Sequence, residues 1–149
     1  MISIINNYII ERFQADELVN TISLSALSLI DTKKENIYPL VSLEFLGKDP
    51  ADELHLYTYT ISILAQRNNT RKMKPSKLME DENWVDNLNE CDSIAVNFIN
   101  YIRRMEIDLP INIESVSDMT PLSGYGGANL DGFEFEITFS LPNNGFCSI

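Results

Sequence analysis

A short basic segment, RNNTRKMKPSK at 67–77, is the first feature of the sequence that could make a functional contact. It contains no acidic residue, whereas the whole chain has 11 basic and 22 acidic residues and a net charge of -11. A cationic segment on an acidic body can bind an acidic surface, including a different surface of another copy. We therefore predict a subunit interface at this segment, formed by Arg67, Arg71, Lys72, Lys74 and Lys77.

Carboxylates at alternate positions of strand-like runs form a second candidate surface. In GFEFEITFSL (132–141), large apolar residues alternate with Glu134, Glu136 and two hydroxyl residues. Successive side chains of a strand point to opposite faces, so one face is apolar and the other is polar. Glu44 has the same outward position in VSLEF (41–45). Paired carboxylates can hold a hard cation or share a proton, but on an outward face we expect them to be solvated. We predict an acidic surface there.

Residue types that support catalysis are few. His55 is the single histidine, it lies in a strand-like run, and no Cys/His group has the spacing of a zinc site. A Ser-His-Asp triad would depend on His55 alone, and the chain has no Gly-x-Ser-x-Gly motif. We expect no catalytic residue, no metal site and no cofactor, and therefore a protein that is not an enzyme.

The glycine-rich stretch GYGGANLDG (124–132) resembles a phosphate-binding loop only superficially. Such a loop follows a strand, opens a helix and usually includes a lysine. Here the next residues have the alternation of a strand, so a flexible connection is the better interpretation. The two cysteines, Cys91 and Cys147, do not make a disulfide framework, and we expect both to be reduced.

Composition excludes several partners. Sequence-independent binding of nucleic acid needs lysines and arginines that face the phosphates. This chain has a net charge of -11, the same sign as the phosphates. No apolar run approaches the length of a membrane span. The N-terminal MISIINNYIIERF has no basic region before its apolar residues, so we expect no secretory signal and a protein that works, or is assembled, in a cytoplasm.

Hydrophobic periodicity predicts the elements of the first half. Apolar residues at spacings of three and four predict a helix from Ile2 to about Val19. Residues 20–35 are expected to form a short strand or an extended arm. Residues 36–47 and 54–67 alternate as two strands of a β-hairpin, joined by a turn at 48–53.

The second half predicts a long helix and two strands. Apolar residues from Trp84 to Met105 repeat every three or four positions and form one stripe. A weak strand at 109–117, a glycine-rich connection and a strand at 132–141 follow. We predict a single α+β domain over 1–149, an antiparallel sheet packed against two helices, with a long basic loop at 67–80 and a C-terminal tail at 142–149.

Three stretches carry a set of degenerate motifs in a fixed order. IDTKKENIYPLVSLEF (30–45) has an Asp-x-Lys approach to an aromatic-Pro-Leu strand entry. HLYTYTISILAQRNN (55–69) is a strand that runs into a polar loop, and in NLDGFEFEITFSLPNNGFC (129–147) Leu-x-Gly opens a strand that stops at Pro-Asn before a late Cys. Together they resemble small virion proteins of tailed bacteriophages, the tail-terminator or tail-completion-like proteins of the neck and related head–tail connector rings.

The resemblance implies a structural role. Such proteins fold as an α+β sandwich and form a ring oligomer that surrounds the DNA path in the virion. The implied partners are further copies of the chain and neighbouring neck and tail proteins, with no membrane. An acidic lumen would repel phosphates, so that double-stranded DNA passes through without specific binding; this is a hypothesis based on the net charge.

Two other functions fit the same residues. The first is an acidic DNA mimic that inhibits a DNA-binding enzyme, although the basic segment interrupts any continuous row of carboxylates. The second is a small α+β ligand-binding or regulatory domain with a pocket near Tyr57, Tyr59 and Trp84.

Overall fold

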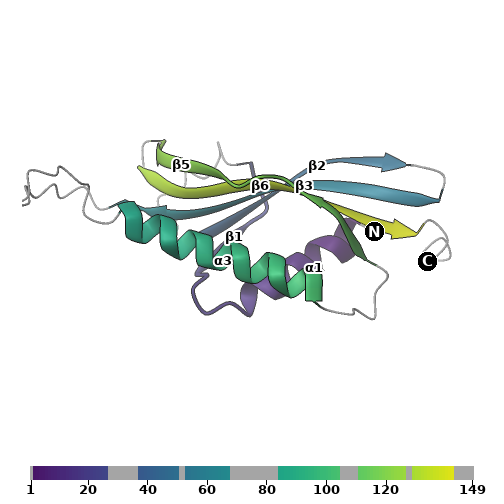
Figure 1. Ribbon diagram of the computed structural model, residues 1–149, viewed down its shortest axis with the longest axis horizontal. Coiled ribbons are helices and arrows are strands. Elements are labelled where there is room, and N and C mark those ends of the chain that lie inside the picture. Colours follow the sequence, from purple (N-terminus) through teal and green to yellow (C-terminus); the bar gives the residue numbers. More distant parts are fainter. Residues whose placement is uncertain are drawn as a thin grey trace, which may run out of the picture.

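The structure, a computed structural model, describes residues 2–26, 37–50, 53–67, 84–104, 111–126 and 129–142. Two helices pack against one face of a six-stranded, mostly antiparallel sheet (Figure 1), which confirms the predicted α+β class. The elements, with the labels of Figure 1, are α1 (Ile2–Gln14), β1 (Thr21–Ser23), β2 (Leu40–Pro50), β3 (Leu54–Gln66), α3 (Trp84–Arg104), β4 (Asn112–Val116), β5 (Thr120–Tyr125) and β6 (Leu130–Pro142).

The sheet is organised around β6. The strand order is β1-β2-β3-β6-β4, and β5 pairs with β6 beside β4, so β6 has β3 along one edge and two short strands along the other. The described pairs are antiparallel except β1 with β2, which run parallel over three residues of each strand, Thr21–Ser23 against 40–42. Because both edges of β6 are paired, its side chains can contact other layers only from the two faces of the sheet.

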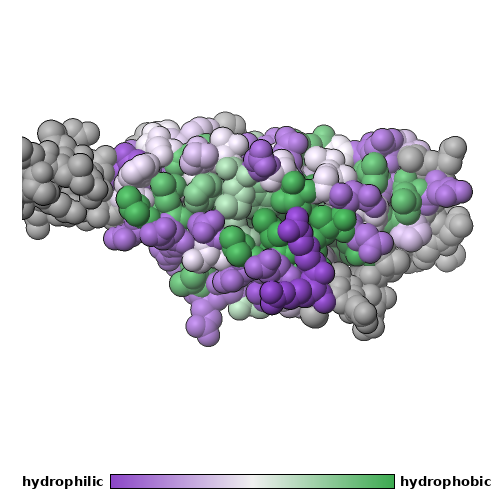
Figure 2. Space-filling view, in the orientation of Figure 1, coloured by the Kyte–Doolittle hydropathy of each residue, from purple (hydrophilic) through white to green (hydrophobic). Residues whose placement is uncertain are grey.

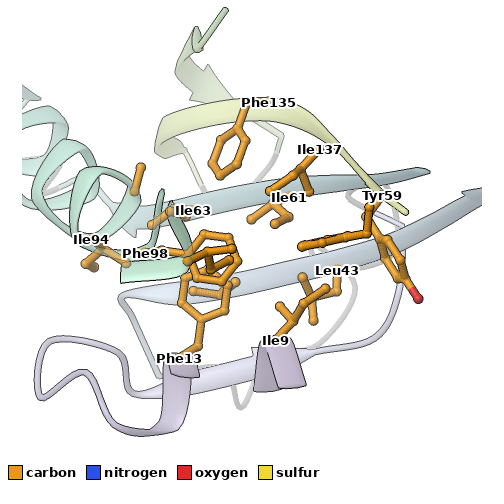
Figure 3. Close-up of a cluster of buried hydrophobic side chains, with 14 of the residues drawn as sticks. Ile9, Phe13, Leu43, Tyr59, Ile61, Ile63, Ile94, Phe98, Phe135 and Ile137 are labelled. Carbon is orange, nitrogen blue, oxygen red and sulfur yellow. The ribbon is translucent and has the colours of Figure 1, made fainter. Parts of the chain in front are cut away.

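The core lies between the sheet and the two helices. α1 contributes Ile5, Ile9 and Phe13, and α3 contributes a stripe that includes Phe98 and Ile94; these pack on inward residues of β2, β3 and β6 (Figure 3). Phe13 and Phe98 stack with ring centroids 4.3 Å apart, which joins the two helices over the sheet. The stripe at spacings of three and four, visible in the sequence, is the buried face of α3.

The predicted hairpin is confirmed as β2–β3, but both bounds of its first strand are corrected: residues 37–39, which we assigned to the strand, precede β2, which begins at Leu40. β2 continues to Pro50, so the residues from Lys48 onward that we assigned to a turn belong to the strand. A register shift between Phe45 and Gly47 inserts an extra residue and lets the pairing continue to His55. Such a bulge reverses the alternation of the residues that follow it, and this broke the period-two pattern on which the prediction depended.

The predicted end of the first helix is also corrected. α1 ends at Gln14, five residues before the predicted end at Val19. Asp16 turns the chain: its amide donates to the Phe13 carbonyl at 3.1 Å, and its carboxylate accepts from the Leu18 amide at 3.0 Å. A side chain that binds the backbone two residues on competes with the helix, as aspartate often does.

The glycine-rich connection contains a strand that the sequence did not predict. β5 pairs with the first half of β6, although Pro121 and Gly124 are poor strand formers. An edge strand tolerates both residues because only one of its edges is paired. The weak strand predicted at 109–117 is present as β4 (Asn112–Val116). The glycine-rich stretch after it forms a β5–β6 hairpin, because β5 pairs antiparallel with β6.

Several predicted segments lie outside the described residues. These are most of the arm at 20–35 after β1, the basic loop beyond Arg67, the last helical residue Met105, and the tail after Pro142, including Cys147.

Replacement of Gly132 by alanine tests the close packing of β6 against β3. A Cβ atom at Gly132 would overlap the carbonyl oxygen of Ile63, whereas a Cβ atom at Gly47 would meet nothing within 4 Å. We expect Gly132→Ala to reduce the free energy of unfolding by about 3 kcal/mol and Gly47→Ala to change it by less than about 0.5 kcal/mol. Chemical denaturation monitored by circular dichroism measures both. Equal stability of the two variants would contradict this packing.

Candidate subunit interface

Arg67, the first residue of the predicted basic interface, is held inside the protein. Its Nε and Nη2 atoms donate to the two carboxylate oxygens of Asp131 at 2.9 and 2.5 Å. The Arg67 side chain is 14% exposed and the Asp131 side chain is completely buried. The structure therefore assigns Arg67 to an internal ion pair, and its charge is neutralised by the protein's own carboxylate.

Two further groups complete the environment of Asp131. Asn87 of α3 donates through Nδ2 to Asp131 Oδ2 at 3.2 Å, and the amide of Gly124 in β5 donates to Oδ1 at 3.0 Å. A buried carboxylate is stable only when it is paired and hydrogen-bonded, and these donors satisfy both oxygens. The network joins β3, β5, β6 and the start of α3 at one end of the sheet.

This network fixes the two points between which the basic segment runs. Asn87 also donates to the carbonyl of Gln66, next to Arg67, at 3.1 Å. Trp84, the first residue of α3, donates through its indole nitrogen to the Ser123 hydroxyl of β5 at 2.9 Å. Residue 67 and residue 84 are thus anchored beside the same strands. Arg71, Lys72, Lys74 and Lys77 lie between these anchors, outside the described residues.

The three glutamates of the predicted acidic surface do share one face of the sheet. Glu44 of β2 and Glu136 of β6 both align with Thr60 of β3, so the three residues form one row across the sheet. Two strand spacings of about 4.8 Å separate the two glutamates. Glu134 lies in the next row, opposite Ser62. Glu136 is exposed and the other two glutamates are half-buried.

Hydroxyl side chains surround these carboxylates. The rows that carry the glutamates also place serine or threonine on β2, β3 and β5, and Thr58 and Thr138 are hydrogen-bonded to each other at 3.1 Å. We call this the outer face; its hydroxyl residues are Ser42, Thr58, Thr60, Ser62, Thr120, Thr138 and Ser140. Both described helices lie on the opposite side of the sheet, so neither covers the outer face (Figure 1). Ser42, Ser62 and Ser140 are nevertheless buried, and Ser42 donates its hydroxyl to the Ser25 carbonyl at 2.6 Å, so only part of this face is accessible.

One end of the outer face is apolar. Leu40, Leu64 and Leu130 are fully buried there and form a second small cluster, with Tyr38, Leu122 and Tyr125 packed against it. The same cluster lies beside the strands that hold Arg67 and Asp131. The acidic part of the outer face is therefore bounded at one end by packed apolar side chains.

Cations gather on the helix layer, which the sequence did not predict. The basic residues of the described ranges are Arg12, Lys48, Arg67, Arg103 and Arg104. The Arg12 guanidinium stacks over the Tyr101 ring at 4.0 Å from its centroid, and Arg104 lines a shallow depression of about 290 Å³ with Arg12, Asn97, Asn100 and Tyr101. The spacing of residues 97, 100, 101 and 104 places them on one face of α3. Arg12 joins them only because α1 packs beside α3, which the sequence does not show.

Figure 2 shows the distribution of hydrophobic and hydrophilic residues on one side of the molecule. Hydrophobic residues gather over the junction of the sheet and the helices, and hydrophilic residues follow the rim of the helix layer below it. Within the described ranges Arg12, Arg103 and Arg104 make no ion pair, whereas Arg67 is paired with Asp131.

The residues considered for chemistry do not come together. His55 is half-buried in β3 opposite Leu141, and no group of three or more His, Cys, Asp or Glu among the described residues is placed to hold a metal ion. Cys91 is buried in α3; burial, followed by the charges of Glu90 and Asp131, raises the pKa of its thiol to about 12. A thiol with this pKa stays protonated and is a poor nucleophile.

The pocket considered for a small ligand is not formed by the predicted residues. Tyr57 and Tyr59 are core residues in the first half of β3, and Tyr59 donates its hydroxyl to Asn6 at 2.8 Å. Trp84 binds Ser123 near the row of Leu64, about 20 Å further along β3 at the usual rise per strand residue. The three aromatic residues therefore do not line one cavity.

No protein family model matches the chain, and a search of curated proteins finds no match. Neither described helix is long and apolar enough to cross a membrane.

Conversion of Asp131 to asparagine tests the buried network. The change removes the carboxylate charge that pairs with the Arg67 guanidinium, and loss of one partner of a buried pair typically costs about 3–5 kcal/mol. We expect the unfolding free energy to decrease by about that amount, measured by urea denaturation. Glu114→Gln, at an exposed position of β4, is the matched control and should leave stability unchanged.

A second variant separates the loss of a charge from the loss of the pair. Arg67→Met with Asp131→Leu removes both charges of the pair, and we expect it to be more stable than Asp131→Asn alone, which removes one charge and retains the other. If the single variant were as stable as the unchanged protein, the network would not be a structural support.

Proposed function

We propose that the chain is a non-enzymatic structural protein of a tailed-bacteriophage virion, where it forms or completes a ring at the neck or tail end. One observation carries the proposal beyond the motif resemblance: the outer face has glutamates and no described cation, whereas three arginines gather at one end of the helix layer, away from the acids in the first half of α3. The glutamates lie on the outer face of the sheet, and Arg12, Arg103 and Arg104 lie on the helix layer.

An acidic outer face and a group of arginines at one end of the helix layer favour head-to-tail association of identical subunits. When one surface of a subunit contacts a different surface of its neighbour, repetition generates a ring if the rotation closes. Like surfaces would repel here, since two outer faces would bring glutamates against glutamates. A two-fold dimer through the outer face is therefore disfavoured, and a cyclic assembly is the expected product.

The outer face also fits the passage of DNA better than its capture. Within the described residues no lysine or arginine projects from that face: three arginines are on helices, Lys48 lies over the Tyr57 ring and Arg67 is paired with Asp131. A surface of carboxylates and hydroxyls has no cation for phosphates. We propose that duplex DNA passes the ring without specific binding, and that the protein resides in the virion after assembly in the host cytoplasm.

Assembly state tests this function. We expect closed rings in negative-stain images and by light scattering, either for the chain alone or after mixing with the neighbouring neck and tail proteins. No retardation of duplex DNA is expected at physiological salt. A chain that makes no ring under either condition, and that displaces DNA from a DNA-binding enzyme, would be a DNA mimic and would end the proposal.

The basic segment provides a separate test of the interface. Reversal of Arg71, Lys72 and Lys74 to glutamate adds negative charge to an already acidic chain, so we expect ring formation to be lost while the circular dichroism melting curve is unchanged. Lys48→Glu, which reverses an exposed lysine of β2, is the control and should still assemble. Unchanged assembly of the triple variant would exclude the segment from the interface.

A further inference from the structure

The depression between α1 and α3 has the features of a docking site for carboxylates. Two guanidinium groups, Arg12 and Arg104, line it together with Tyr101 and the amide side chains of Asn97 and Asn100. The Arg12 side chain is held in place by its stacking on the Tyr101 ring. A cation that is already ordered loses little side-chain entropy when it binds a partner.

The protein's own charges do not occupy this depression. No described carboxylate makes an ion pair with Arg12 or Arg104, in a chain whose net charge is -11. Glu11 lines the adjoining depression with Tyr8, Arg12 and Tyr101, but it is recorded in no ion pair with the arginine within the described ranges. The position of Arg104 in the last turn of α3 suits the helix dipole, yet this does not explain the second arginine of α1.

The outer face has the complementary set. Glu44 and Glu136 flank Thr60 in one row, and Glu134 lies in the next, also without a described ion pair. Bidentate pairing of guanidinium with carboxylate is geometrically specific as well as favourable. Of the hydroxyl residues in the glutamate rows, Thr60 is half-buried and Thr120 is exposed. These two can therefore bind the amide side chains of Asn97 and Asn100 in the same contact.

We propose that the Arg12–Tyr101–Arg104 depression binds the row of Glu44 and Glu136 on the outer face of a second copy of this chain. The inference rests on the proposed function, because it requires self-assembly, and it identifies the two contacting surfaces. It is independent of the basic segment, since the arginines of the depression lie on the helices. The contact joins the helix layer of one copy to the sheet of the next, as a head-to-tail ring requires.

Complementary charge reversals test the contact. Arg104→Glu and Glu136→Lys should each weaken self-association about tenfold at low salt, because each juxtaposes like charges. A 1:1 mixture of the two variants, or one chain that carries both changes, should recover assembly, since every contact then joins opposite charges. Sedimentation over a concentration series measures all four samples.

Arg103→Glu is the matched control for Arg104→Glu. Arg103 is exposed in the same last turn of α3, so its reversal has the same effect on the helix dipole, but it lines a different depression, with Ile111 and Ile113. We expect this control to associate as the unchanged protein does. Circular dichroism of each variant checks that the fold is retained.

The outcomes separate this contact from the function on which it rests. Rings from the unchanged chain, with Arg104→Glu and Glu136→Lys equally competent, would overturn the contact and leave the ring function standing. Loss of assembly in both single variants without recovery in the mixture would also overturn it. If the unchanged chain forms no ring alone or with its neck and tail neighbours, the proposed function fails first. If the unchanged chain binds duplex DNA and Arg104→Glu abolishes that binding, the partner of the depression is nucleic acid and not a second copy.

Discussion

Alternation of side chains along β6 is the constraint on which the rest of the structure depends. The strand is paired on both edges, to β3 on one side and to β4 and β5 on the other, so its residues can meet other layers only through its two faces. Phe135, Ile137 and Phe139 are buried against the helices, while Glu134 and Glu136 are directed to the outer face. A one-residue shift of register would exchange these faces and place carboxylates in the core.

The buried network at Asp131 acts at the end of that strand. Asp131 has the inward phase of β6, and its carboxylate gathers Arg67, Asn87 and the Gly124 amide around it. The Asp131 carboxylate is tolerated in this buried position because both of its oxygens accept hydrogen bonds, and loss of either member of the ion pair would be destabilising. The network ties three strands to the start of α3, on either side of the segment that carries the remaining basic residues.

Arg67 and the arginines of the helix layer are therefore in different environments. Arg67 is used within the subunit, whereas Arg12 and Arg104 face solvent on the helix layer beside Tyr101. The outer face has the opposite sign and no described cation. The acidic outer face and the arginines at one end of the helix layer are the surfaces on which the proposed head-to-tail assembly depends. A protein that imitates DNA acts through negative charge, so these arginines would not contribute to that function.

Local patterns alone determined much of the fold. Period-two alternation predicted β3 and β6 and the outward position of Glu134 and Glu136, and the stripe at spacings of three and four predicted α3, because these features reflect which side of an element meets the core. The bulge after Phe45, the end of α1 at Asp16 and the edge strand β5 were not predicted, since each depends on pairing or hydrogen bonds with other parts of the chain.

Only the tertiary structure decided how the charges are used. In the sequence, Arg67 is one of several cations in a basic segment, and Asp131 is an acid in a glycine-rich stretch 64 residues away. Arg12 and Arg104 are likewise far apart along the chain and meet only because α1 and α3 pack side by side through Phe13 and Phe98. A charge acts through distance in space and through burial, and neither quantity is contained in the local pattern of residues.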